Sequence, residues 1–472
     1  MNEFELHSDR LGTTDELGRR IFPQPADVRG KYRIGRMQLQ AILIFVFLGL
    51  PWLRIGNRQA LLFDIANRRF EFFGLSLRAH NAPLLVLVFG AALFGLFFVT
   101  AIWGRIWCGW ACPQTVFIDG VFRRIERWIE GGALERRKLD RSPMTVRKFR
   151  LRSVKWTLYL FVSLILAHSF LAYFVGTDLL AKMMTQAPTE HWTSFSFMAA
   201  LTGVLVFNFG WFREQFCVIA CPYGRFQSVI MDSSSMIVAY DVDRGEPRAT
   251  PQAKVLQKTH GGKLGDCVNC YRCVQVCPVG IDIRRGLQME CIACTACADA
   301  CDEVMTKVKK PTGLIRYDSL LGLKNKSKSP PRFTPRAGFY GLGILTCVLS
   351  LVYFLEIMKP VDITLLRASG EPYQVQSGLV INHFKLEISN QSDVGHELDF
   401  ASAEPGLELV TALRPVPVEA NDISRSSLFI RVAKDRFNAG QKTIKLRILD
   451  TDKKTGKTLV SIKEVTLVGP FN

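Results

Sequence analysis

The sequence predicts a multi-domain protein: a polytopic α-helical membrane domain of about five spans, a cysteine-rich segment inserted into it, and a C-terminal β-sandwich. Three observations lead to this prediction. Five apolar runs are nearly free of charge, two runs of cysteines repeat one spacing, and the residues after Lys359 alternate apolar and polar side chains. With 472 residues, the chain has room for two to four domains.

The five apolar runs predict the membrane spans, at roughly 37–53, 83–103, 154–175, 192–212 and 337–358. About 20 helical residues cross a bilayer, and the four longer runs lack the polar residues at helical spacing that a soluble helix carries. The first run is shorter and contains Gln38, Gln40 and Pro51, but we also expect it to span. Residues 1–36 lack the apolar core of a cleavable signal peptide and are predicted to form a mostly flexible tail.

The net charge of +18 is unevenly distributed, and its placement predicts the topology. Eleven basic residues lie between Arg123 and Arg152, whereas only Lys182 lies between the third and fourth spans. Cytoplasmic loops carry an excess of Lys and Arg, so the amino terminus and the loops 104–153 and 213–336 are predicted to be cytoplasmic and the tail outside. The loop 54–82 disagrees, and its apolar residues suggest a place in the membrane interface. This placement of charge argues against nucleic-acid binding.

Two runs of cysteines predict iron–sulfur clusters. The first reads C-x2-C-x2-C-x3-C-P, and the second repeats the spacing with Asp302 in place of the proline. In bacterial two-cluster ferredoxins, the fourth cysteine of each run binds the other run's cluster. We therefore predict a bacterial-type ferredoxin-like segment with one 4Fe–4S cluster on Cys267, Cys270, Cys273 and Cys301, and a second on Cys291, Cys294, Cys297 and Cys277. The alternative, a pair of structural zinc sites, usually has a longer gap between two C-x2-C halves.

The chain is expected to contain six segments: a cytoplasmic tail (1–36), a membrane domain with spans one to four (37–239), a 2×(4Fe–4S) ferredoxin-like domain (240–310), a basic linker (311–336), span five (337–358) and an extracytoplasmic domain (359–472). In the last segment, residues 380–388, 427–432, 443–448 and 459–467 alternate in the pattern of half-buried strands. About seven such strands fit an immunoglobulin-like β-sandwich. Such a domain either binds a partner or acts as a spacer.

A second set of cysteines lies where the second and fourth spans end. Each motif reads aromatic, Arg, then C-x3-C-P, with Cys108 and Cys112 in one and Cys217 and Cys221 in the other. Two spans separate the motifs, so both emerge on the membrane face of the ferredoxin-like segment. Residues i and i+4 share a helix face, and each proline predicts a kink or a helix start. If the motifs face each other, four thiolates form a candidate copper or redox site; packing cysteines and a structural zinc site are the alternatives.

Other residues carry weaker predictions. His168 lies within the third span, where an ionisable group is a functional candidate, although a hydrogen-bonded helix contact is the alternative. Cys347, in the fifth span, is expected to serve packing. Arg105 and Arg213 could stabilise neighbouring thiolates or anchor the helices by the charge rule. Three residues of the outer loop could contact copper: Met183, Met184 and His191.

With these features assembled, the chain resembles the CcoG/FixG family of cytochrome c oxidase accessory proteins, also called RdxA or RdxB. The resemblance covers almost the whole chain, including both cluster runs and the sandwich tail. Its motifs are Phe22-Pro23 to Gly30-Lys-Tyr-Arg33, Trp107-Cys108-Gly-Trp-Ala-Cys112-Pro-Gln-Thr115, and Arg213-Glu-Gln-Phe-Cys217 to Cys221-Pro-Tyr-Gly-Arg225. The resemblance implies reduction of Cu(II) to Cu(I) for assembly of the cbb-type oxidase, a bacterial inner-membrane location, and copper chaperones or oxidase subunits as partners. The resemblance also implies that the two C-x3-C-P pairs are candidate copper-site or redox residues.

These features together predict a membrane-bound iron–sulfur electron-transfer protein that acts as a cupric reductase and takes electrons from an unidentified cytoplasmic donor. Two alternatives stay open. One is a quinol-linked electron-transfer subunit similar to NapH and NosR, and the other is a redox-sensing assembly scaffold without turnover. The sequence leaves the oligomeric state open, a homo-oligomer included.

Overall fold

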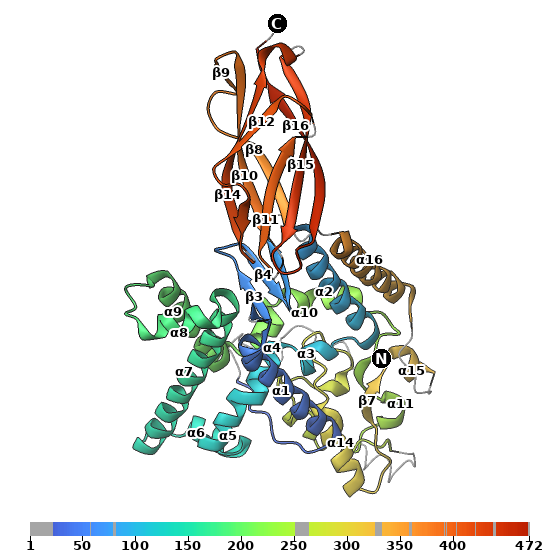
Figure 1. The fold of residues 1–472 in the computed structure, drawn as a ribbon. Coiled ribbons are helices and arrows are strands. Elements are labelled where there is room, and N and C mark those ends of the chain that lie inside the picture. Colours follow the sequence, from blue (N-terminus) through green and yellow to red (C-terminus); the bar gives the residue numbers. More distant parts are fainter. Residues whose placement is uncertain are drawn as a thin grey trace. The chain divides into compact units, whose positions relative to one another are not determined.

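A computed structural model describes residues 22–470, apart from 57, 79–81, 251–263, 326–332, 358–360, 391, 393, 403, 421, 438 and 439. The chain forms two compact units, Met1–Leu351 and Val352–Asn472. Most of the predicted tail 1–36 and part of the predicted linker 311–336 lie outside the described residues. Figure 1 shows the elements of both units.

Five helices among the described residues are long and apolar enough to cross a membrane, as predicted. They are α1 (Lys31–Gly49, extended to Trp52 by η1, Leu50–Trp52), α2 (Ala82–Trp103), α7 (Val146–Val175), α9 (Trp192–Phe207, extended by the π-helix η4, Asn208–Phe212) and α16 (Pro335–Ile357). Most of their apolar surface is exposed, and the most apolar window of α16 contains no buried residue. Exposed apolar helices of this length are expected when lipid covers them.

The first helix begins before its apolar run because a distant carboxylate caps it. Asp299 accepts hydrogen bonds from the backbone N–H groups of Tyr32 (3.2 Å) and Arg33 (2.7 Å). These groups have no partner within the helix, so an acceptor at this end stabilises it. Gly30 precedes the helix, and a Cβ there would lie 2.3 Å from the Asp299 carboxyl carbon. The first span is thereby attached to the cysteine-rich segment.

The loop after the first span forms small antiparallel sheets in place of an open loop. Its strands are β1 (Arg54–Ile55), β2 (Arg58–Gln59), β3 (Leu61–Asp64), β4 (Arg69–Phe72) and β5 (Leu75–Arg78). Glu71 is 1% exposed and forms ion pairs with Arg58 (3.7 Å) and Arg69 (2.5 Å), and Arg54 pairs with Asp178. The loop 54–82 disagreed with the charge rule because of its arginines. Three of them, Arg54, Arg58 and Arg69, therefore have carboxylate partners.

Short helices surround the ends of the spans. They are α3 (Ile106–Trp110), α4 (Pro113–Phe117), the π-helix η3 (Ile118–Phe122), α5 (Arg123–Glu130), α6 (Ala133–Arg141), α8 (Thr177–Thr185), the π-helix η5 (Phe216–Ala220) and α10 (Pro222–Ile230). The cysteine-rich segment contains α11 (Val242–Gly245), α13 (Arg272–Gln275), η6 (Ile283–Arg285) and α14 (Ala296–Lys307), and α15 (Leu320–Lys324) follows it. Strands β6 (Ile237–Tyr240) and β7 (Ile315–Asp318) pair antiparallel on either side of this segment.

The C-terminal unit is the predicted sandwich of two antiparallel sheets, seen in Figure 1. One sheet has the order β12 (Leu407–Thr411), β14 (Ile423–Ala433), β10 (Leu379–Asn390), β8 (Val361–Arg367), with β9 (Gln374–Gln376) also paired to β10. The other has the order β13 (Val416–Val418), β11 (His396–Ser402), β15 (Gln441–Asp452), β16 (Thr458–Val468). The four segments predicted from alternation lie within β10, β14, β15 and β16. The described strands exceed the predicted seven because the short β9 and β13 lack an alternating run.

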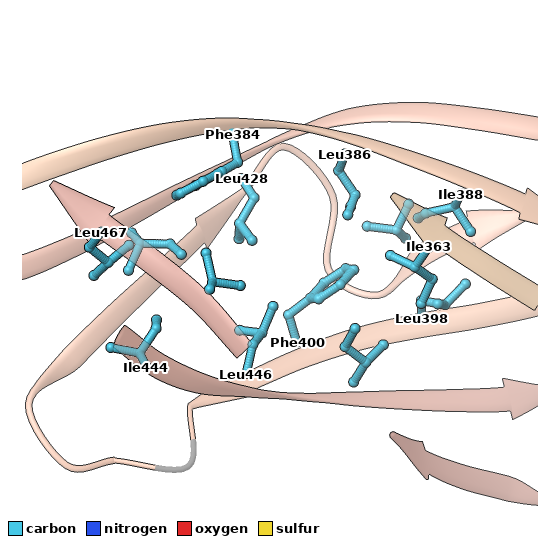
Figure 2. Packing of buried hydrophobic residues seen from close by; sticks show 14 of the residues in the cluster. Ile363, Phe384, Leu386, Ile388, Leu398, Phe400, Leu428, Ile444, Leu446 and Leu467 are labelled. Atoms are coloured by element: carbon cyan, nitrogen blue, oxygen red, sulfur yellow. The ribbon is translucent and has the colours of Figure 1, made fainter. Parts of the chain in front are cut away.

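The sandwich core is the shared interior of the two sheets. In Figure 2, Phe384 and Leu386 of β10 lie opposite Phe400 of β11 and Leu446 of β15. All four side chains are at most 4% exposed. Aligned sheets of this kind bury every second residue of each strand, which is the alternation that the sequence displays.

Truncation of this core should destabilise the sandwich strongly. Leu446 is fully buried on the central strand β15, and deletion of a buried leucine side chain costs about 2–5 kcal/mol. We expect Leu446→Ala to lower the opening free energy of β15 amides by that amount in hydrogen–deuterium exchange of the full chain. Leu459→Ala on β16 is the matched control, because Leu459 is 51% exposed. Equal effects of the two variants would contradict this account of the core.

Candidate metal centres

The first four-cysteine group lines one cavity of the inserted segment. Cys267 and Cys270 precede α13, Cys273 lies on α13, and Cys301 lies on α14. All four side chains border the same cavity. Burial and the neighbouring thiols raise the pKa of Cys301 to about 12. The structure therefore brings together the four residues that the spacing assigned to one cluster.

The second group lines an adjacent cavity. Cys277 follows α13, Cys291 and Cys294 precede α14, and Cys297 lies on α14. Burial, as the largest cause, raises the pKa of Cys291 to about 11 and the pKa of Cys297 well above its usual value. Cys273 of the first group borders this cavity as well, so the two cavities are neighbours.

The two cysteine loops share a left-handed backbone conformation at two equivalent positions. Asn269 and Tyr271 have φ angles of 55° and 57°, and the equivalent Ala293 and Thr295 have φ angles of 53° and 61°. Non-glycine residues rarely adopt this left-handed conformation. Its recurrence at matching positions shows that the repeated spacing folds into a repeated loop.

The donors in each cavity fit a 4Fe–4S cluster. In each cavity, burial raises the pKa of at least two of the four thiols. Such thiols lose their protons together only if a bound cationic centre compensates their charge. Thiolates that bind one ion at about 2.3 Å must approach one another to within about 4 Å. In the described part of the chain, no group of three or more His, Cys, Asp and Glu side chains is placed to hold one metal ion. The ferredoxin spacing of these cysteines, together with the four thiols that border each cavity, fits a 4Fe–4S cluster.

The two C-x3-C-P motifs have matching local structures. Pro113 starts α4 and Pro222 starts α10, so the predicted helix starts are present. Cys112 and Cys221 precede these prolines in extended conformation. The backbone N–H of each donates to the carbonyl five residues earlier, Cys112 to Trp107 and Cys221 to Phe216, both at 2.8 Å. The weak sequence repeat is therefore a structural repeat.

The four membrane-edge thiols lie close enough to influence one another, and we call them the thiol group: Cys108, Cys112, Cys217 and Cys221. Burial raises the pKa of Cys108 to about 11, and Cys112 and Cys221 add to this effect. The pKa of Cys217 is also raised, by burial first and then by the other three thiols and Glu214. Backbone N–H groups of Gln114 and Thr115 act in the opposite direction on Cys112.

The thiol group adjoins the second cluster cavity. Cys108 and Cys217 pack against the same buried cluster, Val279, Ile281 and Ile292, as three cysteines of the second group: Cys277, Cys291 and Cys294. Gly109 makes this approach possible, because a Cβ there would lie 2.5 Å from the Ile292 carbonyl oxygen. The cysteine repeat at the membrane edge and the second cavity are therefore neighbours in one compact unit.

The chain matches three families of known sequences. They are a 4Fe-4S binding domain at residues 84–132, a 4Fe-4S dicluster domain at 212–320, and the IG-like fold at the C-terminal of FixG at 351–470. Protein RdxA of Cereibacter sphaeroides is 32% identical over 467 residues, which cover 94% of this chain and 96% of RdxA. The chain belongs to the FixG/RdxA family. Protein RdxB of the same organism is 34% identical over 457 residues (92% and 93% covered), and the nitrogen fixation protein FixG of Rhizobium meliloti is 38% identical over 316 residues (66% and 59%).

These matches establish an iron–sulfur electron-transfer protein of the FixG/RdxA family. The dicluster match contains both four-cysteine groups, and the 84–132 match contains Cys108 and Cys112. The C-terminal match covers the sandwich. The resemblance based on motifs and the predicted fold class are confirmed.

The two arginines of the repeat have different roles in this FixG/RdxA-family protein. Arg105 donates to the carbonyls of Gly224 (2.9 Å), Cys291 (3.4 Å) and Met289, and its charge lowers the pKa of the Cys108 thiol. Arg213 instead forms an ion pair with the buried Glu126. The expectation that both arginines stabilise thiolates therefore receives support for Arg105 only.

Two site residues have no signal in the sequence. Gln227 of α10 is fully buried, and its amide lies 3.2 Å from the sulfur of Cys108. Gly109 lies inside the first motif, but nothing in the motif indicates that a carbonyl would approach its Cα. Both contacts join segments far apart in the chain, so one sequence could not reveal them.

We expect a methyl group at Gly109 to separate the thiol group from the second cavity. In Gly109→Ala, α3 must move away from the backbone of Ile292, because the new Cβ would be too close to a carbonyl oxygen. With Cu(II) added as a test oxidant, reoxidation of the reduced clusters should slow about tenfold or more relative to the parent, with the iron content unchanged. Stopped-flow spectroscopy measures this rate, and Gly95→Ala in α2, where a Cβ meets nothing within 4 Å, is the control.

His168 lies in a separate cavity of about 250 Å³. Its Nδ1 lies 2.8 Å from the carbonyl oxygen of Leu164, one turn earlier in α7, which fits the helix-contact interpretation. The same cavity is lined by the three outer-loop residues named above: Met183, Met184 and His191. Cys347 lies against Gly90 of α2, 3.4 Å from the position of a Cβ there, as expected for packing.

Proposed function

We propose that this protein is a cupric reductase that supplies Cu(I) for maturation of a cbb-type cytochrome oxidase. One observation carries the proposal. Cys108 and Cys217 pack against the same apolar residues as Cys277, Cys291 and Cys294 of the second four-cysteine group. Soft thiol donors are thus held beside the part of the chain that fits an electron carrier.

The chemistry needed is the addition of one electron to Cu(II). Bound 4Fe–4S clusters supply single electrons, which the protein obtains from a cytoplasmic donor. Thiolates favour Cu(I) over harder cations, so the thiol group would bind the ion and stabilise the reduced product. Arg105 partly offsets the increase that burial causes in the pKa of Cys108.

The proposal includes a topology and a location. By the charge rule, the thiol group and the cluster cavities face the cytoplasm, and the sandwich lies outside a bacterial inner membrane. Oxidase subunits and copper chaperones are the proposed partners. Single turnover of anaerobic, pre-reduced protein tests the activity. Two one-electron clusters should yield about two Cu(I) per chain as the cluster absorbance bleaches, and a yield near zero would reject the proposal.

A quinol-linked role similar to that of NapH is the second candidate. The cavity beside His168 favours it, because a largely apolar pocket of about 250 Å³ with an imidazole could hold a quinol ring. Extraction of the purified protein should then yield a bound quinone, and His168→Ala should release it. If the purified protein contains no quinone and reduces copper, the quinol-linked role is rejected and the cupric-reductase proposal stands.

A further inference from the structure

A polar cavity lies apart from the thiol group, and we call it the arginine cavity. Five arginines and two aspartates line it: Arg33, Arg36, Arg123, Arg127, Arg136, Asp27 and Asp119. It measures about 40 Å³, and one water molecule needs about 10–15 Å³ on the same measure. The cavity therefore has room for about three waters, comparable to the oxygens of one phosphate group.

The carboxylates of the cavity do not satisfy its arginines. Asp119 pairs with Arg33, Arg36 and Arg123 at once, and Asp27 pairs with Arg127. Two carboxylates thus face five guanidinium groups inside the cavity. Glu214 and Glu126 contact Arg123 and Arg136 from outside the lining. Glu126 is also shared with Arg213, so positive charge remains around the cavity after both are counted.

Unpaired donors provide an independent indication of a ligand. The Nε atoms of Arg36, Arg123 and Arg136 are buried without a hydrogen-bond partner among the described residues. Arg36 is only 4% exposed and Arg136 only 3% exposed. Buried charged donors without acceptors are costly, and three of them around one cavity indicate a missing anionic acceptor.

We propose that the arginine cavity binds one phosphate group. Guanidinium groups bind phosphate oxygens through paired hydrogen bonds, and the cavity offers several donors around one small space. The phosphate belongs either to an anionic phospholipid headgroup or to a soluble phosphate. Exposed Trp128 of α5 (79%) and Leu134 of α6 (71%) are typical of helices in a membrane interface, which provides a route for a lipid.

The site has a structural consequence for the cluster region. Its lining also includes Val28 of the 22–30 segment, Val276 and Pro278 beside Cys277, and Ala296 beside Cys297. A phosphate group would therefore join the 22–30 segment, α5 and α6 to the backbone of the second four-cysteine group. This binding role is independent of copper reduction.

Direct binding to the purified, cluster-loaded full chain tests the proposal. Equilibrium dialysis with radioactive orthophosphate detects the soluble form, and native mass spectrometry after addition of phosphatidylglycerol or phosphatidylcholine detects the lipid form. We expect about one phosphate group per chain. Saturation by orthophosphate identifies a soluble source, and retention of phosphatidylglycerol alone identifies a lipid source. Absence of both orthophosphate and phosphatidylglycerol binding overturns the proposal.

Three variants make the test specific. Arg127→Gln removes a partly exposed lining charge, and Arg136→Lys keeps the charge but removes the guanidinium fork. Arg124→Gln is the control, because Arg124 lies on α5 but outside the cavity lining. Both lining variants should bind at least tenfold more weakly with unchanged iron content. If Arg136→Lys loses iron, only the phosphate binding of Arg127→Gln is used to test the proposal. Equal weakening by Arg124→Gln would show non-specific attraction and overturn the proposal.

Discussion

A Cys108→Ala/Cys112→Ala double variant should lose Cu(II) reduction while its two clusters stay in place. The thiol group is the set of soft donors beside the second cavity, and the double variant removes half of it. We expect the rate of Cu(I) formation by pre-reduced protein to fall at least about 100-fold. Cu(I) chelation and cluster absorbance are to be followed together, so that electron loss and copper reduction are compared in one sample.

Cys347→Ala is the matched control for this double variant. Cys347 is also a membrane cysteine, but it packs against α2, away from the thiol group. The control should reduce copper like the parent. If the double variant also reduces copper like the parent, the clusters transfer electrons without the thiol group and the proposed site is wrong. If it loses about four irons, the thiol group holds a cluster of its own, as the 84–132 match permits.

The elements that the sequence predicted are those whose signal is local. Apolar runs of bilayer length revealed the five spans, and alternation revealed the long strands β10, β14, β15 and β16. The short strands β9 and β13 carry too few residues to display a period. The grouping of Cys277 with Cys291, Cys294 and Cys297 was also predictable, because the ferredoxin spacing implies it.

The contacts that position the candidate site could not be predicted, because they depend on tertiary packing. Asp299 caps a helix that begins at Lys31, and no local pattern relates these residues. Arg105 and Arg213 occupy equivalent positions of a repeat, yet only Arg213 meets a buried carboxylate, Glu126. Charge at a helix end is visible in a sequence, whereas its partner depends on which segment packs there.

Cys294→Ala should remove the second cluster and, with it, most of the copper reduction. Cys294 lines the second cavity and packs in the apolar cluster that Cys108 and Cys217 contact. Loss of one of four thiolates leaves an incomplete ligand set, so the iron content should fall from about eight to about four per chain. Copper reduction should fall at least about tenfold, because the electron carrier beside the thiol group is gone.

Cys301→Ala provides the comparison, because Cys301 belongs to the first group and lies outside the cluster of residues around Cys108. It should also lose about four irons. We expect it to retain rapid single-turnover reduction of about one Cu(I) per chain, since the second cluster still adjoins the thiol group. Iron assay, electron paramagnetic resonance and Cu(I) chelation distinguish the two variants. Equal copper reduction by both would show that position beside the thiol group does not matter, and the proposed electron route would be wrong.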